Sequence, residues 1–139
     1  ETLFHDGLSI IARADHPLMT ASSISYDDLS RYPWVLPRKG APARAIFDAI
    51  AERHGIGATA AGVVETGSLV ALRGILLSTD RLTILSRRQI VFEEKAGLLG
   101  IVPVALPPTE RPIGVTTRSG WKPTVLQAEF LAALREAAG

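Results

Sequence analysis

The chain alternates between short apolar runs and segments in which apolar residues recur every three or four positions. The runs that predict strands cover residues 8–12, 34–36, 63–65, 80–85, 98–106 and 113–117. Helical periodicity covers about residues 42–54, 69–77, 87–96 and 123–138, and a shorter helix follows residue 25. Strands that alternate with amphipathic helices in this way predict an α/β fold, in which helices cover a mixed or parallel sheet.

Local signals mark where several of these helices begin and end. Ser25 stands three residues before an acidic residue, the spacing of a capping box, and Pro33 ends the short helix that follows. Pro42 suits the first turn of the next helix. The helix over residues 69–77 is apolar at nearly every position except Arg73, so we expect it to be largely buried.

Length and composition are those of one domain-sized α/β body. The chain has 139 residues, of which 47% are hydrophobic and 21% charged, so it can bury a core. Lys and Arg number 15 against 14 Asp and Glu, and the formal net charge of +1 provides no basic field for a phosphate backbone. This segment itself is therefore not expected to bind nucleic acid.

Cysteine usage and the lack of targeting signals favour the cytoplasm. The absence of cysteine excludes a disulfide framework, a thiolate zinc site and a cysteine nucleophile, and it suits a reducing compartment. The longest apolar stretches, such as residues 98–106, are far too short for a membrane span, and the first residues lack the basic-then-apolar order of a signal peptide. We expect a soluble protein without membrane contact, and because it begins with Glu1 rather than Met we expect a fragment.

Catalytic motifs are not found in the sequence. It contains no G-x-S-x-G, G-x-x-x-x-G-K, H-E-x-x-H or G-x-G-x-x-G pattern. The histidines are scattered: His5 stands beside an acid at a strand edge, His16 precedes a proline, and His54 lies at a helix end. The adjacent acids at 27–28 and 93–94 point in different directions in a helix and cannot share one proton site. The sequence therefore predicts a protein that is not an enzyme and that holds no metal or cofactor.

One candidate binding feature is the turn of Thr66, Gly67 and Ser68, which stands between a strand and the apolar helix. Unpaired N–H groups and the positive end of the helix dipole at such a turn can receive an anion or a polar oxygen. Every helix has such an end, and the alternative that Ser68 only caps its own helix is equally open.

A second candidate feature is the loop of Pro37, Arg38 and Lys39, which follows a short strand and precedes another helix start, with Arg44 in the first turn. In an open α/β sheet, ligands collect outside the carboxyl ends of strands, so this loop and the turn at 66–68 can line one crevice. The basic residues favour a carboxylate or another small anion there. The alternative is that the three basic side chains simply face water.

Several short motifs, taken in order, give the sequence a family resemblance. They are Leu8 to Ala12, Asp15-His16-Pro17-Leu18, Leu29 followed by Tyr32-Pro33-Trp34-Val35-Leu36-Pro37, Val64-Glu65-Thr66 with Ser68, Asp80-Arg81-Leu82, and Arg111-Pro112-Ile113-Gly114-Val115. In order and spacing they resemble the C-terminal substrate-binding domain of LysR-type transcription regulators, and the likeness spans essentially the whole chain.

The resemblance implies the type 2 periplasmic-binding-protein fold, in which two α/β lobes are joined by crossing strands and hold an effector in the cleft between them. It implies that residues 8–12 form the first crossing strand and residues 113–117 the return. Residues 1–12 and 111–139 would then belong to a partial first lobe, and residues 13–110 to a nearly complete second lobe. The last helix would pack on the first lobe.

The resemblance also implies a ligand site, with some departures from the family pattern. The family's effector contacts that fall in this segment map onto Pro37, Arg38, Lys39, Thr66, Gly67 and Ser68, so half of the site is expected here. The winged helix-turn-helix, its linker helix and the opening part of the first lobe are missing. Residues 76–79 read Leu-Leu-Ser-Thr where many members have a glycine-rich turn, which leaves the conformation of that turn open.

The function implied by the resemblance is that of a regulator that binds a small-molecule effector, a carboxylate, to control transcription in the bacterial cytoplasm. Its other partners would be further copies of itself, as a dimer or tetramer, and DNA only through the missing helix-turn-helix. Two other classes stay open. A fragment of a periplasmic solute-binding protein shares the architecture, and a signal peptide upstream would favour it. An enzyme on the same clamp, such as a porphyrin-pathway deaminase or a dehydratase, would need a catalytic or cofactor-bearing residue in the cleft.

Overall fold

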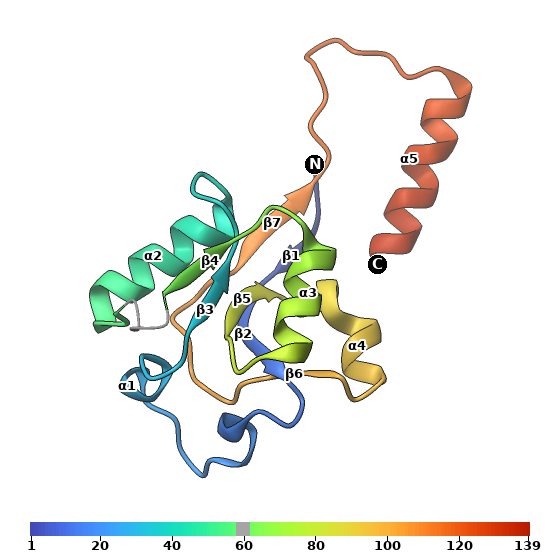
Figure 1. Cartoon of the computed structure of the whole chain (residues 1–139). Helices are drawn as coiled ribbons and strands as arrows, with labels where there is room; N and C mark the ends of the chain where they lie inside the picture. Colours follow the sequence, from blue (N-terminus) through green and yellow to red (C-terminus); the bar gives the residue numbers. More distant parts are fainter. Residues whose placement is uncertain (58–61) are drawn as a thin grey trace. The chain divides into compact units, whose positions relative to one another are not determined.

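The computed structural model describes residues 1–57 and 62–139, which form two compact units (Figure 1). The larger unit is residues 8–109, and the smaller unit joins residues 1–7 to residues 110–139. No helix in the described part of the chain combines the length and the apolar character needed to cross a membrane.

The larger unit is built on strands that run in both directions. They are β2 (Leu8–Arg13), β3 (Trp34–Leu36), β4 (Val63–Glu65), β5 (Thr83–Ser86) and β6 (Leu99–Ile101). The central strand β2 pairs antiparallel with β5 on one side and with β6 on the other, and β3 pairs parallel with β4. A parallel bridge from Trp34 to Leu82 brings β3 against the start of β5, with Val35 N–H donating to Leu82 O at 2.9 Å. The predicted mixed α/β arrangement is therefore present.

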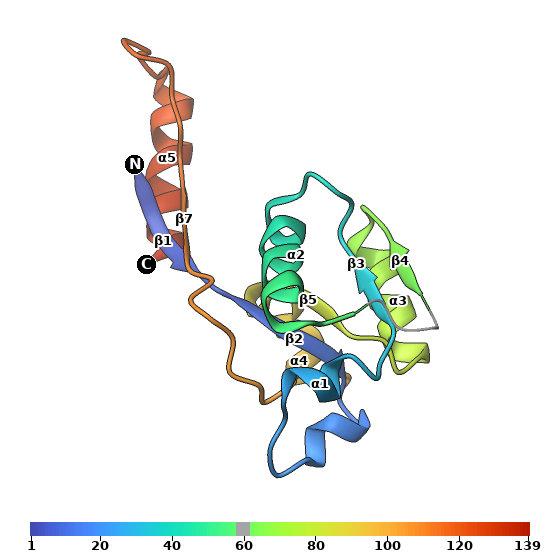
Figure 2. The same ribbon diagram turned by 90° about the vertical axis from the view of Figure 1, so that its left-hand side faces the viewer.

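Helices cover both faces of these strands. In chain order they are the 3₁₀ turn η1 (Pro17–Thr20), α1 (Tyr26–Leu29), α2 (Pro42–His54), α3 (Leu69–Ser78), the 3₁₀ turn η2 (Arg87–Ile90) and α4 (Val91–Lys95). Figures 1 and 2 both show β3 between α2 and α3.

The side chains of β2 point alternately to the two faces of the strands, which explains why helices cover both faces. Ile10 faces the core cluster that holds Phe47 of α2, whereas Ile11 faces the cluster that holds Leu72 and Leu76 of α3. Successive side chains of a strand point to opposite faces, so the consecutive buried residues Ile10, Ile11 and Ala12 require cover on both sides of β2.

The prediction that the apolar helix α3 is largely buried is wrong. Only Leu72 and Leu76 are buried, while Val70 is 77% exposed and Leu77 is 43% exposed. The helix lies as an outer layer against one face of the strands, so only one of its sides meets the core, whatever the residues on the other side.

Two further predicted elements are shorter than expected. The single helix over residues 87–96 is divided into η2 and α4, because Ile90 leaves helical geometry at φ −122° and ψ 14°. The strand over residues 98–106 forms a ladder only from Leu99 to Ile101, although Val102 N–H still donates to Ile10 O at 2.9 Å. The ladder ends there because the Val104 N–H donates to Val102 O at 2.8 Å, in a tight turn centred on Pro103, instead of to β2.

The smaller unit consists of a two-stranded ladder and the last helix. Strand β1 (Thr2–Asp6) pairs antiparallel with β7 (Arg111–Gly114), and α5 runs over Val125–Ala138. Thr124 and Gln127 form a capping box at the start of α5, and an Arg135–Glu1 ion pair at 2.7 Å links the helix to β1. β1 was not predicted, because its five residues alternate weakly between apolar and polar. Strand β7 corresponds to the predicted strand over residues 113–117, but it begins and ends earlier.

Candidate functional site

The two candidate loops leave the same edge of the β3–β4 pair. The strands run parallel with Leu36 opposite Glu65, so Pro37 and Thr66 each follow a carboxyl end at the same level. Thr66 N–H donates to Leu36 O at 3.0 Å, which continues the pairing one residue into the turn. Parallel pairing therefore brings together two segments that are almost thirty residues apart in sequence.

A pocket of about 230 Å³ lies between these loops. It is lined by Pro37, Arg38, Ala41, Thr66, Gly67, Ser68, Leu69, Leu72, Leu85 and Gln89. Five of the six sequence-predicted site residues are in this lining, whereas Lys39 is exposed and does not line the pocket. The apolar floor comes from leucines of α3 and β5, and the polar groups come from the two loops.

The start of α3 presents several hydrogen-bond donors to the pocket. Ser68 Oγ accepts the Ala71 N–H at 3.2 Å, so the interpretation of Ser68 as a helix cap is confirmed. Thr66 Oγ1 in turn accepts the Ser68 N–H at 3.1 Å. Within the described part of the chain, neither hydroxyl donates its proton, and the N–H groups of Gly67 and Leu69 find no acceptor.

Arg38 adds a positive charge beside these donors. Its side chain lies against Gly67, with Nε 3.6 Å from the point where a Cβ would stand on that glycine. It is exposed, and among residues 1–57 and 62–139 it forms no ion pair with an acidic side chain. The guanidinium is therefore available to a ligand anion.

Arg44 has a different role from the one expected of a basic residue near this loop. Its side chain is only 9% exposed, and it forms ion pairs at 2.7 Å with both Asp48 and Glu65. Nη1 also donates to Pro37 O at 3.2 Å. The interpretation of Arg44 as an anion-attracting or water-facing group is wrong, because burial and two carboxylates already use its charge to hold α2, the loop and β4 together.

Gln89, Leu85 and Leu72 are lining residues that were not predicted from the sequence. Leu85 lies in a third strand, β5, and Gln89 follows it in η2. The long-range bridge from Leu82 to Trp34 brings the start of β5 beside β3. The sequence signal that could have indicated these residues is Ser86. Its side chain caps η2 by accepting the Arg88 N–H at 3.0 Å, and it therefore marks another strand-to-helix turn.

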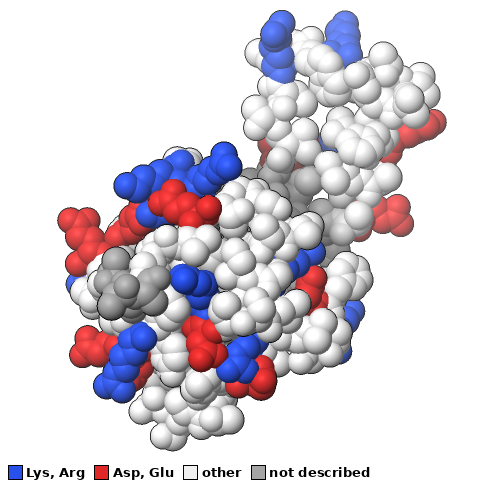
Figure 3. All heavy atoms as spheres, viewed as in Figure 1, with Lys and Arg blue, Asp and Glu red and all other residues white. Residues whose placement is uncertain are grey.

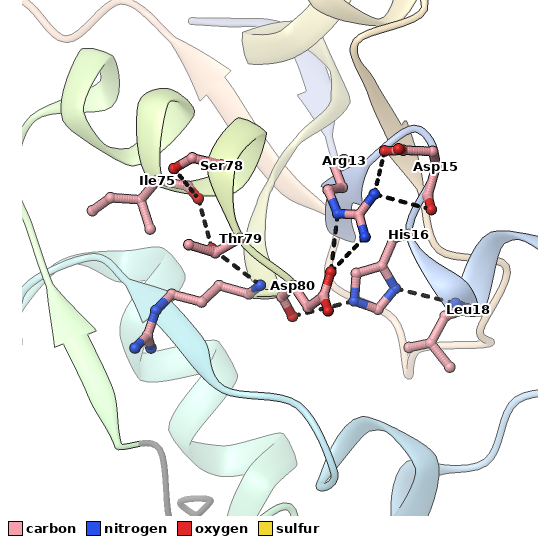
Figure 4. Close-up of polar contacts among 9 residues, drawn as sticks. Arg13, Asp15, His16, Leu18, Ile75, Ser78, Thr79 and Asp80 are labelled. Carbon is pink, nitrogen blue, oxygen red and sulfur yellow. Dashed lines mark hydrogen bonds and ion pairs between the residues drawn. The ribbon is translucent and has the colours of Figure 1, made fainter.

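A second polar cluster lies where β2 meets the turn between α3 and β5 (Figure 4). Arg13 donates to Asp80 Oδ1 through Nε at 3.0 Å and Nη2 at 2.6 Å, and it pairs with Asp15. His16 is 1% exposed; its Nε2 lies 3.2 Å from Asp80 O, and its Nδ1 accepts the Leu18 N–H. Desolvation by burial lowers the pKa of His16 below the ordinary 6.5. Arg13 and His16 thus have their hydrogen-bond partners within the cluster. The cluster therefore has a structural role, in which it joins the end of β2 to the turn between α3 and β5.

Charge elsewhere on the molecule is mixed in sign. On the face shown in Figure 3, basic and acidic side chains lie interspersed over the larger unit. Among the described residues, no group of three or more His, Cys, Asp or Glu side chains is placed to hold a metal ion. The smaller unit has its own hollow of about 380 Å³, with a mainly apolar lining that includes Trp121, Phe130 and Leu131.

Comparison with protein families matches the chain over residues 1–139 to the LysR substrate binding domain. The transcriptional regulator GalR of Pseudomonas putida is 34% identical over 136 residues, which is 98% of this chain and 34% of that protein. The regulator PcaQ of Agrobacterium fabrum is 28% identical over 139 residues, all of this chain and 44% of that protein. The chain thus spans less than half the length of these curated relatives.

Solved structures include similar folds. The regulatory domain of CcmR from Synechocystis, in complex with 2-PG, is 25% identical and superposes with a TM-score of 0.81 over 99% of this chain and 65% of that one. The effector-binding domain of QuiR in complex with shikimate has a TM-score of 0.72 at 14% identity, over 99% of this chain and 63% of that one. The predicted fold class, a type 2 periplasmic-binding-protein-like α/β fold, is confirmed by these neighbours.

Proposed function

The chain belongs to the LysR substrate-binding domain family, and from that membership we propose that it is the effector-sensing part of a LysR-type transcription regulator. The relatives GalR and PcaQ are named transcription regulators, and the neighbouring CcmR and QuiR domains are solved with small molecules. This supports the regulator over the two other classes that the sequence left open, a transport solute-binding protein and an enzyme.

The proposed ligand is a small organic acid held in the pocket at the carboxyl ends of β3 and β4. The observation that carries this proposal is the exposed Arg38 guanidinium beside the donors that begin α3. A carboxylate there would receive charge-assisted hydrogen bonds from Arg38 and from the N–H groups of Gly67 and Leu69. Pro37, Thr66 and Ser68 would shape the same wall, while Lys39 would raise the local positive potential from the rim.

Coupling to transcription is proposed to follow from a ligand that favours one of two arrangements of the regulator. A ligand can shift such an equilibrium only by its difference in affinity for the two states, typically about 1–3 kcal/mol. The assignment of residues 1–12 and 111–139 to one lobe, and of residues 13–110 to the other, belongs to this proposal.

The whole regulator is proposed to act as a dimer or tetramer in the cytoplasm, where it would meet its DNA. DNA would be bound by a helix-turn-helix outside this chain, which is consistent with the net charge of +1 and the mixed surface. No cofactor is part of the proposal.

Calorimetric titration tests the ligand proposal. The chain would be titrated with propionate, lactate, succinate, malate, benzoate and 3-hydroxybenzoate, which differ in size and in hydroxyl content. We expect at least one acid to bind and the Arg38→Gln variant to weaken that binding by about tenfold or more, the effect of losing a charged hydrogen bond.

The matched control is Arg53→Gln, which removes the same charge from an exposed position in the last turn of α2. We expect it to change the affinity by less than about twofold, because exposed charges at a distance are screened. Equal weakening by both variants would show that net charge, rather than the pocket, attracts the acid, and no binding of any acid would refute the proposal.

A further inference from the structure

Gln89 has an unused acceptor in a pocket whose other polar side chains offer donors. Arg38 can only donate, and the oxygens of Thr66 and Ser68 already accept backbone N–H groups at 3.1 and 3.2 Å. In the described part of the chain, the side-chain amide of Gln89 forms no hydrogen bond. Each of these hydroxyl oxygens keeps one lone pair, but Gln89 Oε1 is a lining side-chain oxygen that, within the described ranges, accepts no hydrogen bond at all.

The position of Gln89 is fixed from the same helix whose start forms the donor wall. Arg73 of α3 donates through Nη2 to the backbone carbonyl of Gln89, and Arg73 Nε lies 3.0 Å from Glu93 Oε1 of α4. These contacts hold η2 against α3 while leaving the side-chain amide of Gln89 free to face the pocket. A side chain that is held by its backbone and not by its own polar atoms is suited to contact a ligand.

A donor-rich wall and the unpartnered Gln89 acceptor together define the kind of ligand that matches the pocket. A plain carboxylate satisfies the donors but leaves Gln89 Oε1 without a partner once water is displaced, which has a free-energy cost. A carboxylate that also carries a hydroxyl group satisfies both. The leucines of the floor, Leu69, Leu72 and Leu85, would contact the carbon skeleton between the two polar groups.

We propose that Gln89 is a specificity-determining residue that accepts a hydrogen bond from a hydroxyl of the ligand, so that the pocket selects hydroxy acids over the corresponding deoxy acids. This inference rests on the proposed function, because it requires a carboxylate in the same pocket. In addition to a carboxylate, the inference requires a hydroxyl group on the ligand.

The test compares three matched pairs of acids: lactate with propionate, malate with succinate, and 3-hydroxybenzoate with benzoate. For each pair that binds, the measured quantity is the ratio of the deoxy-acid Kd to the hydroxy-acid Kd. We expect a ratio of about ten in the natural chain for at least one pair, the effect of one hydrogen bond that would otherwise be left unmade. Gln89→Leu, which keeps the size but removes the acceptor, should bring that ratio to about one by weakening only the hydroxy acid.

Gln89→Glu is the conservative variant, because it keeps an acceptor at the same position. Its negative charge weakens both members of a pair alike, so the ratio cancels the repulsion, and we expect the preference for the hydroxy acid to remain. Gln89 is exposed, and thermal melting of each variant would show that the fold is intact.

The outcomes separate the two proposals. A hydroxyl preference that survives Gln89→Leu, or no preference in the natural chain, overturns the role of Gln89 while Arg38-dependent carboxylate binding stands. If none of the six acids binds, both proposals are overturned.

Discussion

At the scale of single residues, burial and partners decide what an identical side chain does. Arg38 and Arg44 are six positions apart, and both follow the same short strand. Arg44 is enclosed and shared between Asp48 and Glu65, whereas Arg38 is exposed and without an acidic partner in the described ranges. The sequence placed both in one group of basic residues, because residue type alone does not report the carboxylates that a fold brings near.

This difference predicts that the same substitution affects stability strongly at Arg44 and very little at Arg38. Arg44→Met should lower the free energy of unfolding by roughly 2 kcal/mol, because it leaves Glu65 and the Pro37 carbonyl without their donor, although the half-exposed carboxylates limit the loss. Arg38→Met should change stability by less than about 0.5 kcal/mol. Urea denaturation measures both, and similar losses for the two variants would contradict the assigned roles.

His16 predicts a pH dependence at the same scale. Its folded pKa lies below the unfolded value of 6.5, because burial disfavours the charged ring. The unfolded state therefore binds the proton first, so stability present above pH 6.5 is lost as the pH falls below that value.

The measurement is the free energy of unfolding between about pH 7 and pH 5, a range above the ordinary pKa values of Asp and Glu. His16→Gln should flatten the slope in this range. A slope that is unchanged in the variant would show that another group titrates there.

At the scale of elements, local patterns predicted helices and strands better than they predicted burial. Ser25 and Pro42 mark helix starts because caps and first-turn prolines act through neighbours in sequence. The exposed side of α3 was missed because its apolar residues do not reveal how many layers cover the helix. The same reasoning applies to the pocket. The loops after β3 and β4 were predicted from their positions after strands, whereas Gln89 reaches the pocket because the long-range bridge from Trp34 to Leu82 brings β5 beside β3.

Two adjacent leucines of α3 test its one-sided burial. Leu76 is fully buried and Leu77 is 43% exposed. Leu76→Ala should lower the free energy of unfolding by about 3 kcal/mol through lost burial and the cavity left behind, and Leu77→Ala by less than about 1 kcal/mol. Denaturant midpoints give the comparison, and equal losses would mean that the outer face of α3 is covered.

At the scale of the whole molecule, the net charge of +1 and the interspersed surface charges argue against direct contact with DNA. We expect the chain alone to bind a labelled DNA duplex no more tightly than about 10⁻⁴ M at physiological salt, the weak limit of non-specific binding. Fluorescence anisotropy provides the measurement. Tighter binding that weakens steeply with added salt would show a basic surface that the charge distribution does not suggest.

The proposed carboxylate site lies where β3 and β4 end. Its most direct test is a ¹⁵N nuclear magnetic resonance titration of the chain with the acid that calorimetry finds to bind. We expect the largest shifts at the amides of Gly67 and Leu69 and at Arg38 Nε, with none in the apolar hollow beside Trp121 and Phe130. Largest shifts in that hollow, or no shift at the start of α3, would contradict it.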